Sequence, residues 1–86
     1  MLVKVKEEGE GIHPNEVVVS ILTQDGPERL VVHRRSIHDG GIEIGYPIFE
    51  ENEYYLIELP RETMGGLWRV WVAKSHLRET NERRVA

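Results

Sequence analysis

The stretch EYYLIELPRETMGGLWRVWVA, residues 53–73, holds two of the three tyrosines and both tryptophans of this chain. Its two ends are rich in β-branched and aromatic residues, whereas the middle, from Pro60 to Gly66, carries the proline and glycines typical of a turn. The stretch therefore predicts two antiparallel strands joined by a loop. These strands carry many of the large side chains from which a core can be built.

Residue parity sets the expected register of this hairpin, because directly opposed residues of an antiparallel pair share one face. If Leu59 opposes Trp68, the inner face is apolar and Glu58 opposes Arg69 on the outer face. A slip of one residue would bury the Arg69 guanidinium, at several times the roughly 0.2–1 kcal/mol that a cross-strand pair contributes. The expected inner face comprises Tyr55, Ile57, Leu59, Trp68, Val70 and Val72, and the outer face comprises Tyr54, Leu56, Glu58, Arg69 and Trp71.

The length and composition indicate one small domain. The chain has 86 residues and no cysteine, which excludes disulfides and cysteine-rich zinc sites. We expect the domain to span residues 1–79 and residues 80–86 to form a polar, frayed tail. No stretch is long and apolar enough to span a bilayer, and residues 1–8 lack the apolar core of a signal peptide. A cytoplasmic protein without membrane contact is the expectation.

Apolar runs in the first half of the chain predict further strands. Residues 2–6 alternate apolar and charged side chains, which suits a short strand with one wet face. Residues 17–23 and 28–34 are β-prone and flank a turn at residues 24–27. A four-residue loop there places Ile21 opposite Leu30.

The segments on either side of the aromatic stretch predict one more strand and a helical turn. Residues 42–48 alternate, with Ile42, Ile44, Tyr46 and Ile48 expected on one inward face and Gly45 and Pro47 marking a bulge or an edge. Residues 74–79 predict a single helical turn capped by Ser75. No internal repeat is apparent in the sequence.

Together these elements predict an all-β protein, a small antiparallel barrel of five or six strands with a short C-terminal helical turn. Closure into a barrel removes exposed strand edges. The layout of a hairpin, a middle strand, an aromatic hairpin with a long loop and a helical turn resembles an SH3-like barrel. The acidic and aromatic signature of peptide-binding SH3 domains is not present, so the resemblance implies the layout and no ligand.

The outer face of the aromatic hairpin is the strongest candidate for a binding site. Tyr54, Leu56, Arg69 and Trp71 belong to the residue types enriched at binding hot spots, and this face is more apolar than a wetted face. Two interpretations stay open: the face packs inside the protein, or it contacts a protein partner or a second copy of this chain. The functional hypothesis is a non-enzymatic binding or assembly module without a cofactor.

A nucleic-acid-associated regulatory barrel is the alternative, using a basic patch of Arg29, Arg34, Arg35 and Arg78. The formal net charge of −4 disfavours this hypothesis, because nucleic-acid binders are usually basic. Residues 74–86 carry four basic and two acidic side chains, so the basic charge gathers at the C-terminal end.

A small histidine-dependent enzyme working at His33 or His38 is a third, weaker hypothesis. The four histidines lie in separate segments without the short spacing of a metal site, and no phosphate-binding loop or nucleophile elbow occurs. The sequence therefore predicts no catalytic residue and no metal site.

Overall fold

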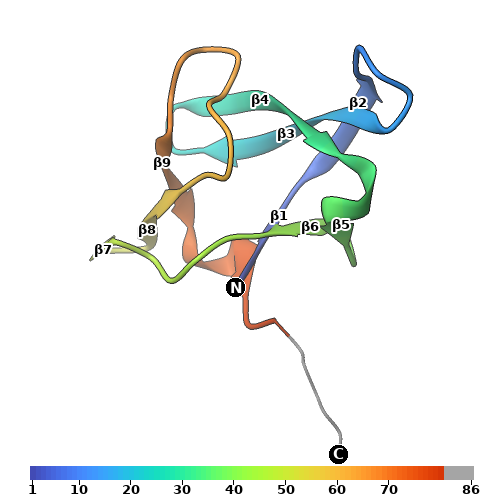
Figure 1. Cartoon of the computed structure of the whole chain (residues 1–86). Coiled ribbons are helices and arrows are strands. Elements are labelled where there is room, and N and C mark those ends of the chain that lie inside the picture. The colour runs from blue at the N-terminus through green and yellow to red at the C-terminus, as the bar shows by residue number, and fades with distance from the viewer. Residues whose placement is uncertain (81–86) are drawn as a thin grey trace, which may run out of the picture.

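The computed structural model describes residues 1–80, and Figure 1 shows how its strands are arranged. Strands dominate and the helical segments are single 3₁₀ turns, so the expected all-β class is confirmed. Residues 81–86 of the expected tail lie outside the described residues. The elements are β1 (Leu2–Lys4), β2 (Lys6–Glu10), β3 (Glu16–Thr23), β4 (Gly26–His33), η1 (Arg34–Ser36), β5 (Ile37–His38), β6 (Gly41–Glu43), β7 (Phe49–Glu51), β8 (Tyr54–Glu58), β9 (Arg69–Ala73), η2 (Lys74–His76) and β10 (Leu77–Arg78).

The strands form three antiparallel sheets, with the orders β10-β1-β6-β5, β2-β3-β4 and β7-β8-β9. Hydrogen bonding closes none of these sheets into a barrel within residues 1–80, which differs from the closed barrel expected from the sequence. Several strands have only two or three residues, and the sheets meet through packed side chains and a few backbone hydrogen bonds. No helix in this part of the chain is long and apolar enough to cross a membrane.

One hydrophobic core lies between the sheets. Along the longer strands, every second residue faces this core. Burying one Val, Leu or Ile side chain contributes roughly 1.5–3 kcal/mol, so this core is the main source of stability. Its buried members are Val3, Val17, Val19, Ile21, Leu30, Val32, Ile42, Ile44, Ile57, Leu59, Val70, Val72 and Leu77.

The β8–β9 hairpin has the register expected from parity. Glu58 pairs with Arg69, and Leu56 pairs with Trp71. The backbone N–H of Leu59 donates to the Trp68 carbonyl (2.8 Å), which extends the ladder by one more pair. Trp68 departs from the expectation of a buried inner-face residue, because its side chain is 52% exposed. The ladder ends there, and the loop after Leu59 does not cover the indole.

The β3–β4 hairpin has a tighter turn than expected. Leu30 opposes Val19, and only residues 24–25 lie between the strands, so the expected Ile21–Leu30 pairing is wrong. The Thr23 hydroxyl donates to the Gly26 carbonyl (2.6 Å), and Gly26 adopts a φ of +115°, which a glycine tolerates. The observed register differs from the expected one by two residues, so the same side chains still face the core.

The expected strand over residues 42–48 ends at Glu43. Ile42 and Ile44 are buried as expected, but Tyr46 is 80% exposed and Ile48 is also exposed. The Ile44 N–H donates to the Met1 carbonyl (2.7 Å), after which Gly45 and Pro47 lead the chain away from the core. Pro47 has no N–H to extend a ladder, which accounts for the early end.

The helical turn after Ala73 is present as the 3₁₀-helix η2, and it is shorter than residues 74–79. Its N-cap residue is Ala73, which makes no side-chain cap, so the expected Ser75 cap is wrong. Ser75 lies inside the turn. A three-residue 3₁₀ turn leaves few backbone N–H groups in need of a cap.

The structure repeats itself internally, although the sequence does not indicate it. We call residues 2–38 the first half and residues 41–78 the second half. Each half contains a short strand, a second strand, a long hairpin, a 3₁₀ turn and another short strand, in the same order. Among matched hairpin positions only Arg29/Arg69 and Val32/Val72 are identical, so the apolar pattern recurs while the residues differ.

Pairing and hydrogen bonds match between the halves. Val3 of β1 pairs with Leu77, and the matched residue Ile42 of β6 pairs with Ile37. Val3 and Ile42 also pair with each other, because β1 and β6 run side by side (Figure 1). Loop hydrogen bonds recur as well. The Val5 N–H donates to the Gly40 carbonyl (2.9 Å), and its counterpart is the bond from the Ile44 N–H to the Met1 carbonyl (2.7 Å). The Arg34 N–H donates to the Asn15 carbonyl (2.8 Å), and its counterpart is the bond from the Lys74 N–H to the Glu53 carbonyl (2.9 Å). The fold therefore builds equivalent positions twice.

Candidate functional site

The outer face of the β7-β8-β9 sheet brings large apolar side chains together. Phe49 pairs with Leu56, and Leu56 pairs with Trp71, so the three side chains form one row across three strands. Tyr54 lies on the same face, two pairs further along the ladder. We call Phe49, Tyr54, Leu56 and Trp71 the aromatic face. Phe49 is 66% exposed and the other three are half-buried, so the aromatic face is accessible.

Phe49 is the member that sequence reasoning missed. The alternation of residues 42–48 predicts only that Phe49 points away from the core, whereas Phe49 begins β7, whose pairing with β8 directs it beside Leu56. The two-residue turn after β7 contains Asn52 with a φ of +55°. Recognising that turn from the residues Asn52-Glu53 would have indicated a third strand in this sheet.

A hollow of about 200 Å³ lies at the edge of the aromatic face. Its lining combines two aromatic rings with two carboxylates, an amide and the tip of the β3–β4 turn; the residues are Gln24, Glu51, Asn52, Glu53, Tyr54 and Trp71. The Gln24 N–H donates to the Trp71 carbonyl (2.8 Å), which fixes this turn beside β9. Aromatic π-faces and carboxylates both attract cations, so the hollow suits a basic side chain.

The charge around the aromatic face is predominantly negative. Lys74 forms an ion pair with Glu50, and its Nζ lies 5.2 Å from the centroid of the Tyr55 ring. The hydrogen bond to Glu50 raises the pKa of Lys74 above its ordinary value, so this lysine is charged at neutral pH. Glu51 and Glu53 at the hollow make no ion pair within the described residues. They are available to a partner.

The internal repeat shows that the fold does not require the aromatic face. Phe49, Leu56 and Trp71 occupy the row that Gly9, Val18 and Val31 occupy in the first half. A glycine and two valines satisfy the same backbone pairing there. The larger side chains in the second half therefore serve something other than strand formation.

Arg69, the fourth residue of the predicted binding site, is exposed on the same outer face, opposite Glu58. The structure thus brings Tyr54, Leu56, Arg69 and Trp71 onto one surface, as the register required. The guanidinium lies at the rim of this surface, two pairs along the ladder from the row that Trp71 and Leu56 share.

The four arginines of the predicted nucleic-acid patch lie in different surroundings. Arg29 is on the outer face of β4, and Arg35 is exposed in η1. Arg34 donates through Nε to the Pro14 carbonyl (3.2 Å) and lies 3.9 Å from a Glu10 carboxylate oxygen. Arg78 donates to the Asp39 carbonyl. Arg34 and Arg78 thus contact different loops of the protein.

The two histidines of the enzyme hypothesis lie near a surface hollow of about 250 Å³ that His33 and His38 line together with Ser36, Glu43, Arg61 and three further residues. His33 Nδ1 accepts a hydrogen bond from the Arg35 N–H (3.2 Å) and so caps η1. That contact assigns His33 a structural role. Within residues 1–80 no three His, Cys, Asp or Glu side chains gather as metal ligands would.

A second group of exposed apolar side chains lies in the loop between β8 and β9. Met64, Leu67 and Trp68 are all exposed there. The Met64 N–H donates to the Arg29 carbonyl (2.7 Å), so the loop is attached to the edge of β4. This group lies on irregular backbone, whereas the aromatic face lies on paired strands that hold its members in fixed positions.

Comparisons with protein-family models, with curated proteins and with solved structures find no match to this chain.

Proposed function

We propose that this protein is a non-enzymatic binding module whose aromatic face accepts a protein segment rich in basic and apolar side chains. The observation that supports this most is the difference between the two halves: large apolar residues stand in the second half where Gly9, Val18 and Val31 suffice in the first. Function resides in sites added to a fold, and this surface is such an addition.

The chemistry of the surface favours that kind of ligand. Phe49, Leu56 and Trp71 supply apolar area that a partner would remove from water, at roughly 25 cal/mol per Å². Tyr54 and Trp71 line the adjoining hollow with Glu51 and Glu53, where a Lys or Arg side chain meets both π-faces and carboxylates. Arg69 at the rim favours an acidic or polar group at one end of the segment.

The scaffold and the location belong to the same proposal. We take the three sheets as an open relative of the SH3-like layout expected from the sequence, with the aromatic hairpin as its binding element. We also take the cytoplasm as the compartment in which the module works.

A second copy of this chain is the alternative occupant of the aromatic face. The molecular mass in solution distinguishes self-association from binding of a different protein. A module that waits for a partner is a monomer of 10.0 kDa by light scattering across a wide range of concentration. A dimer that Trp71→Ala returns to a monomer would replace the partner by a second copy of this chain.

The experiment that tests the proposal is a selection of random peptides on the immobilised full chain, repeated with Trp71→Ala. The wild type should enrich peptides that combine Lys or Arg with apolar residues, and Trp71→Ala should lose them, since hot-spot truncations cost about 2 kcal/mol or more. Trp68→Ala is the matched control, because it removes the other indole, which is outside the aromatic face. Equal enrichment on the wild type and on Trp71→Ala would refute the proposal.

A further inference from the structure

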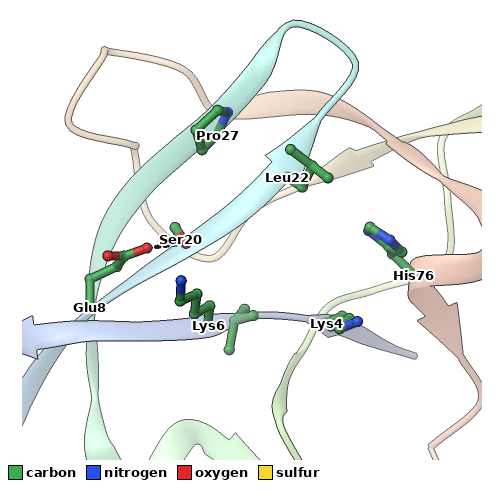
Figure 2. A pocket seen from close by; sticks show the side chains of 8 residues that line it. Lys4, Lys6, Glu8, Ser20, Leu22, Pro27 and His76 are labelled. Atoms are coloured by element: carbon green, nitrogen blue, oxygen red, sulfur yellow. Dashed lines mark hydrogen bonds between the residues drawn. The ribbon is translucent and has the colours of Figure 1, made fainter.

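A groove that shares no lining residue with the aromatic face combines cations with apolar side chains (Figure 2). One hollow of about 420 Å³ lies between the start of the chain, the β3–β4 hairpin and η2. A second hollow, of about 300 Å³, adjoins it and shares Lys4, Val5 and His76. We call the two hollows together the basic groove; the side chains that matter are Lys4, Lys6, Leu22, Pro27, His76 and Arg78.

The two walls of the basic groove differ in chemistry. Figure 2 shows Lys4 and Lys6 along the strand segment at the bottom, with Leu22 and Pro27 on the hairpin above and His76 opposite the hairpin. Lys4 and Lys6 are two residues apart on extended backbone, so their side chains leave the same face. The groove therefore has a cationic side and an apolar side.

The two lysines of the basic groove make no ion pair within residues 1–80, whereas Arg78 donates a hydrogen bond to the Asp39 carbonyl. The ion pairs within residues 1–80 involve Glu10, Glu16, Glu43 and Glu50, and none includes Lys4, Lys6 or Arg78. Two carboxylates also line the basic groove, those of Glu8 and Asp39, and the Glu8 carboxylate accepts a hydrogen bond from the Ser20 hydroxyl (2.7 Å). The Lys4 and Lys6 ammonium groups therefore line the groove without an ion-pair partner in residues 1–80.

The internal repeat relates the basic groove to a second hollow that is also lined by residues of both halves, and several matched side chains differ in charge. By the register of the repeat, Lys4 corresponds to Glu43, His76 to Ser36, and Arg78 to His38. Ser36, His38 and Glu43 line a hollow of about 250 Å³ in which Pro60 takes the place of Leu22. The same backbone thus forms with Glu43 and Ser36 where Lys4 and His76 stand in the basic groove, so Lys4 is not a requirement of folding.

We propose that the basic groove binds an organic phosphate, with the phosphate between Lys4, Lys6 and His76 and the apolar part of the ligand over Leu22 and Pro27. Lysine ammonium groups bind phosphate as point charges, and Arg78 extends the cationic side. A compact dianion balances several unpaired cations at once, which a single carboxylate does not. The combined hollows have the size of small-molecule sites, which begins at about 300 Å³. This site is independent of the aromatic face.

The test is a titration of the full-length protein with phenyl phosphate, followed by amide NMR at constant ionic strength. Phenol serves as the reference ligand for the ring. A separate titration with sodium chloride, in which the ionic strength does rise, serves as the reference for charge screening. We expect saturable shifts at residues 4–6, 20–27 and 75–78, and no saturation with either reference. Lys4→Gln with Lys6→Gln should weaken binding by about tenfold or more, the loss expected for two charge-assisted contacts.

Arg35→Gln is the control variant, since it removes one exposed cation from η1, which lines neither hollow of the basic groove, and should change the affinity for phenyl phosphate by less than about twofold. Absence of saturation, equal binding of phenol, or unchanged affinity in the double-lysine variant would each overturn the proposal. A single-stranded oligonucleotide that shifts these amides while phenyl phosphate fails to saturate would overturn it as well. If the double variant lost its folded spectrum, the wild-type titrations with phenyl phosphate and phenol would decide the question.

Discussion

Glu43 is the residue whose ionisation is most clearly tied to the fold. Its carboxylate accepts hydrogen bonds from the N-terminal ammonium of Met1 (2.8 Å) and from the Thr80 hydroxyl (2.9 Å). These two contacts, the ammonium first, hold the pKa of Glu43 below its ordinary value. A carboxyl group whose pKa is lowered by folding stabilises the folded state above its unfolded pKa, and this stability is lost as pH falls through the folded pKa.

Glu43→Gln should therefore destabilise the protein at neutral pH and lose that effect in acid. The expected difference in unfolding free energy at pH 7 is small, at most about 1 kcal/mol, because the side chain is 54% exposed and solvent screens the pair. Urea denaturation of the wild type and of the variant from pH 7 down to about pH 3 measures it. A difference that stays constant over this range would contradict the assigned role.

Thr63 is a buried polar residue that organises the loop between β8 and β9. Its hydroxyl accepts a hydrogen bond from the Leu67 N–H (3.0 Å), and its side chain is nearly inaccessible. Thr63→Val keeps the shape but leaves that N–H without its partner, which should cost about 1–3 kcal/mol. Thr63→Ser keeps the bond. Hydrogen exchange at the Leu67 amide should accelerate in the valine variant only; acceleration in both would show that the hydroxyl is not the cause.

At the scale of elements, the pairing of β1 with β6 depends on Gly41. A Cβ atom at this position would lie 2.9 Å from the Val3 carbonyl oxygen, which is backbone and has little room to move. Gly41→Ala should therefore destabilise the protein by about 1–3 kcal/mol.

Gly45→Ala is the matched control, because a Cβ atom added at this position would meet nothing within 4 Å. It should change stability by no more than about 0.5 kcal/mol. Equal midpoints for the two variants in urea denaturation would contradict the close β1–β6 contact.

The registers of the two long hairpins differ in how well the sequence predicts them. The register of β8–β9 was predictable because a slip would have buried Arg69, so a large energy separated the alternatives. The register of β3–β4 was not, since a shift of two residues keeps the same face inward and the hydrophobic pattern does not distinguish the two. Only the hydrogen bonds of Thr23 at the turn settle it.

At the scale of the whole molecule, the all-β class followed from local pattern, whereas the division into three sheets and the internal repeat did not. The repeat is carried by backbone pairing, and Val17 and Tyr55, for example, hold matched positions with different side chains. Residue parity within one hairpin predicted which side chains share the binding face. Phe49 joins this face through the pairing of β7 with β8, which the local sequence pattern does not reveal.

Because of the internal repeat, each residue in one half can be compared with the residue at the matched position in the other half. Where matched positions differ in size or charge, the same backbone pairing forms with either residue, as with Gly9 and Phe49 or with Glu43 and Lys4. Both proposed sites rest on this comparison, yet on different residues. Failure of one leaves the other intact.

The most direct measurement is amide NMR of the full chain with the peptide most enriched by selection, read residue by residue. If the aromatic face is the binding site, the shifts concentrate at residues 49–58 and 69–73, and Trp71→Ala abolishes them while Trp68→Ala does not. Shifts that centre on residues 64–68, or on the basic groove, would contradict a binding role for the aromatic face.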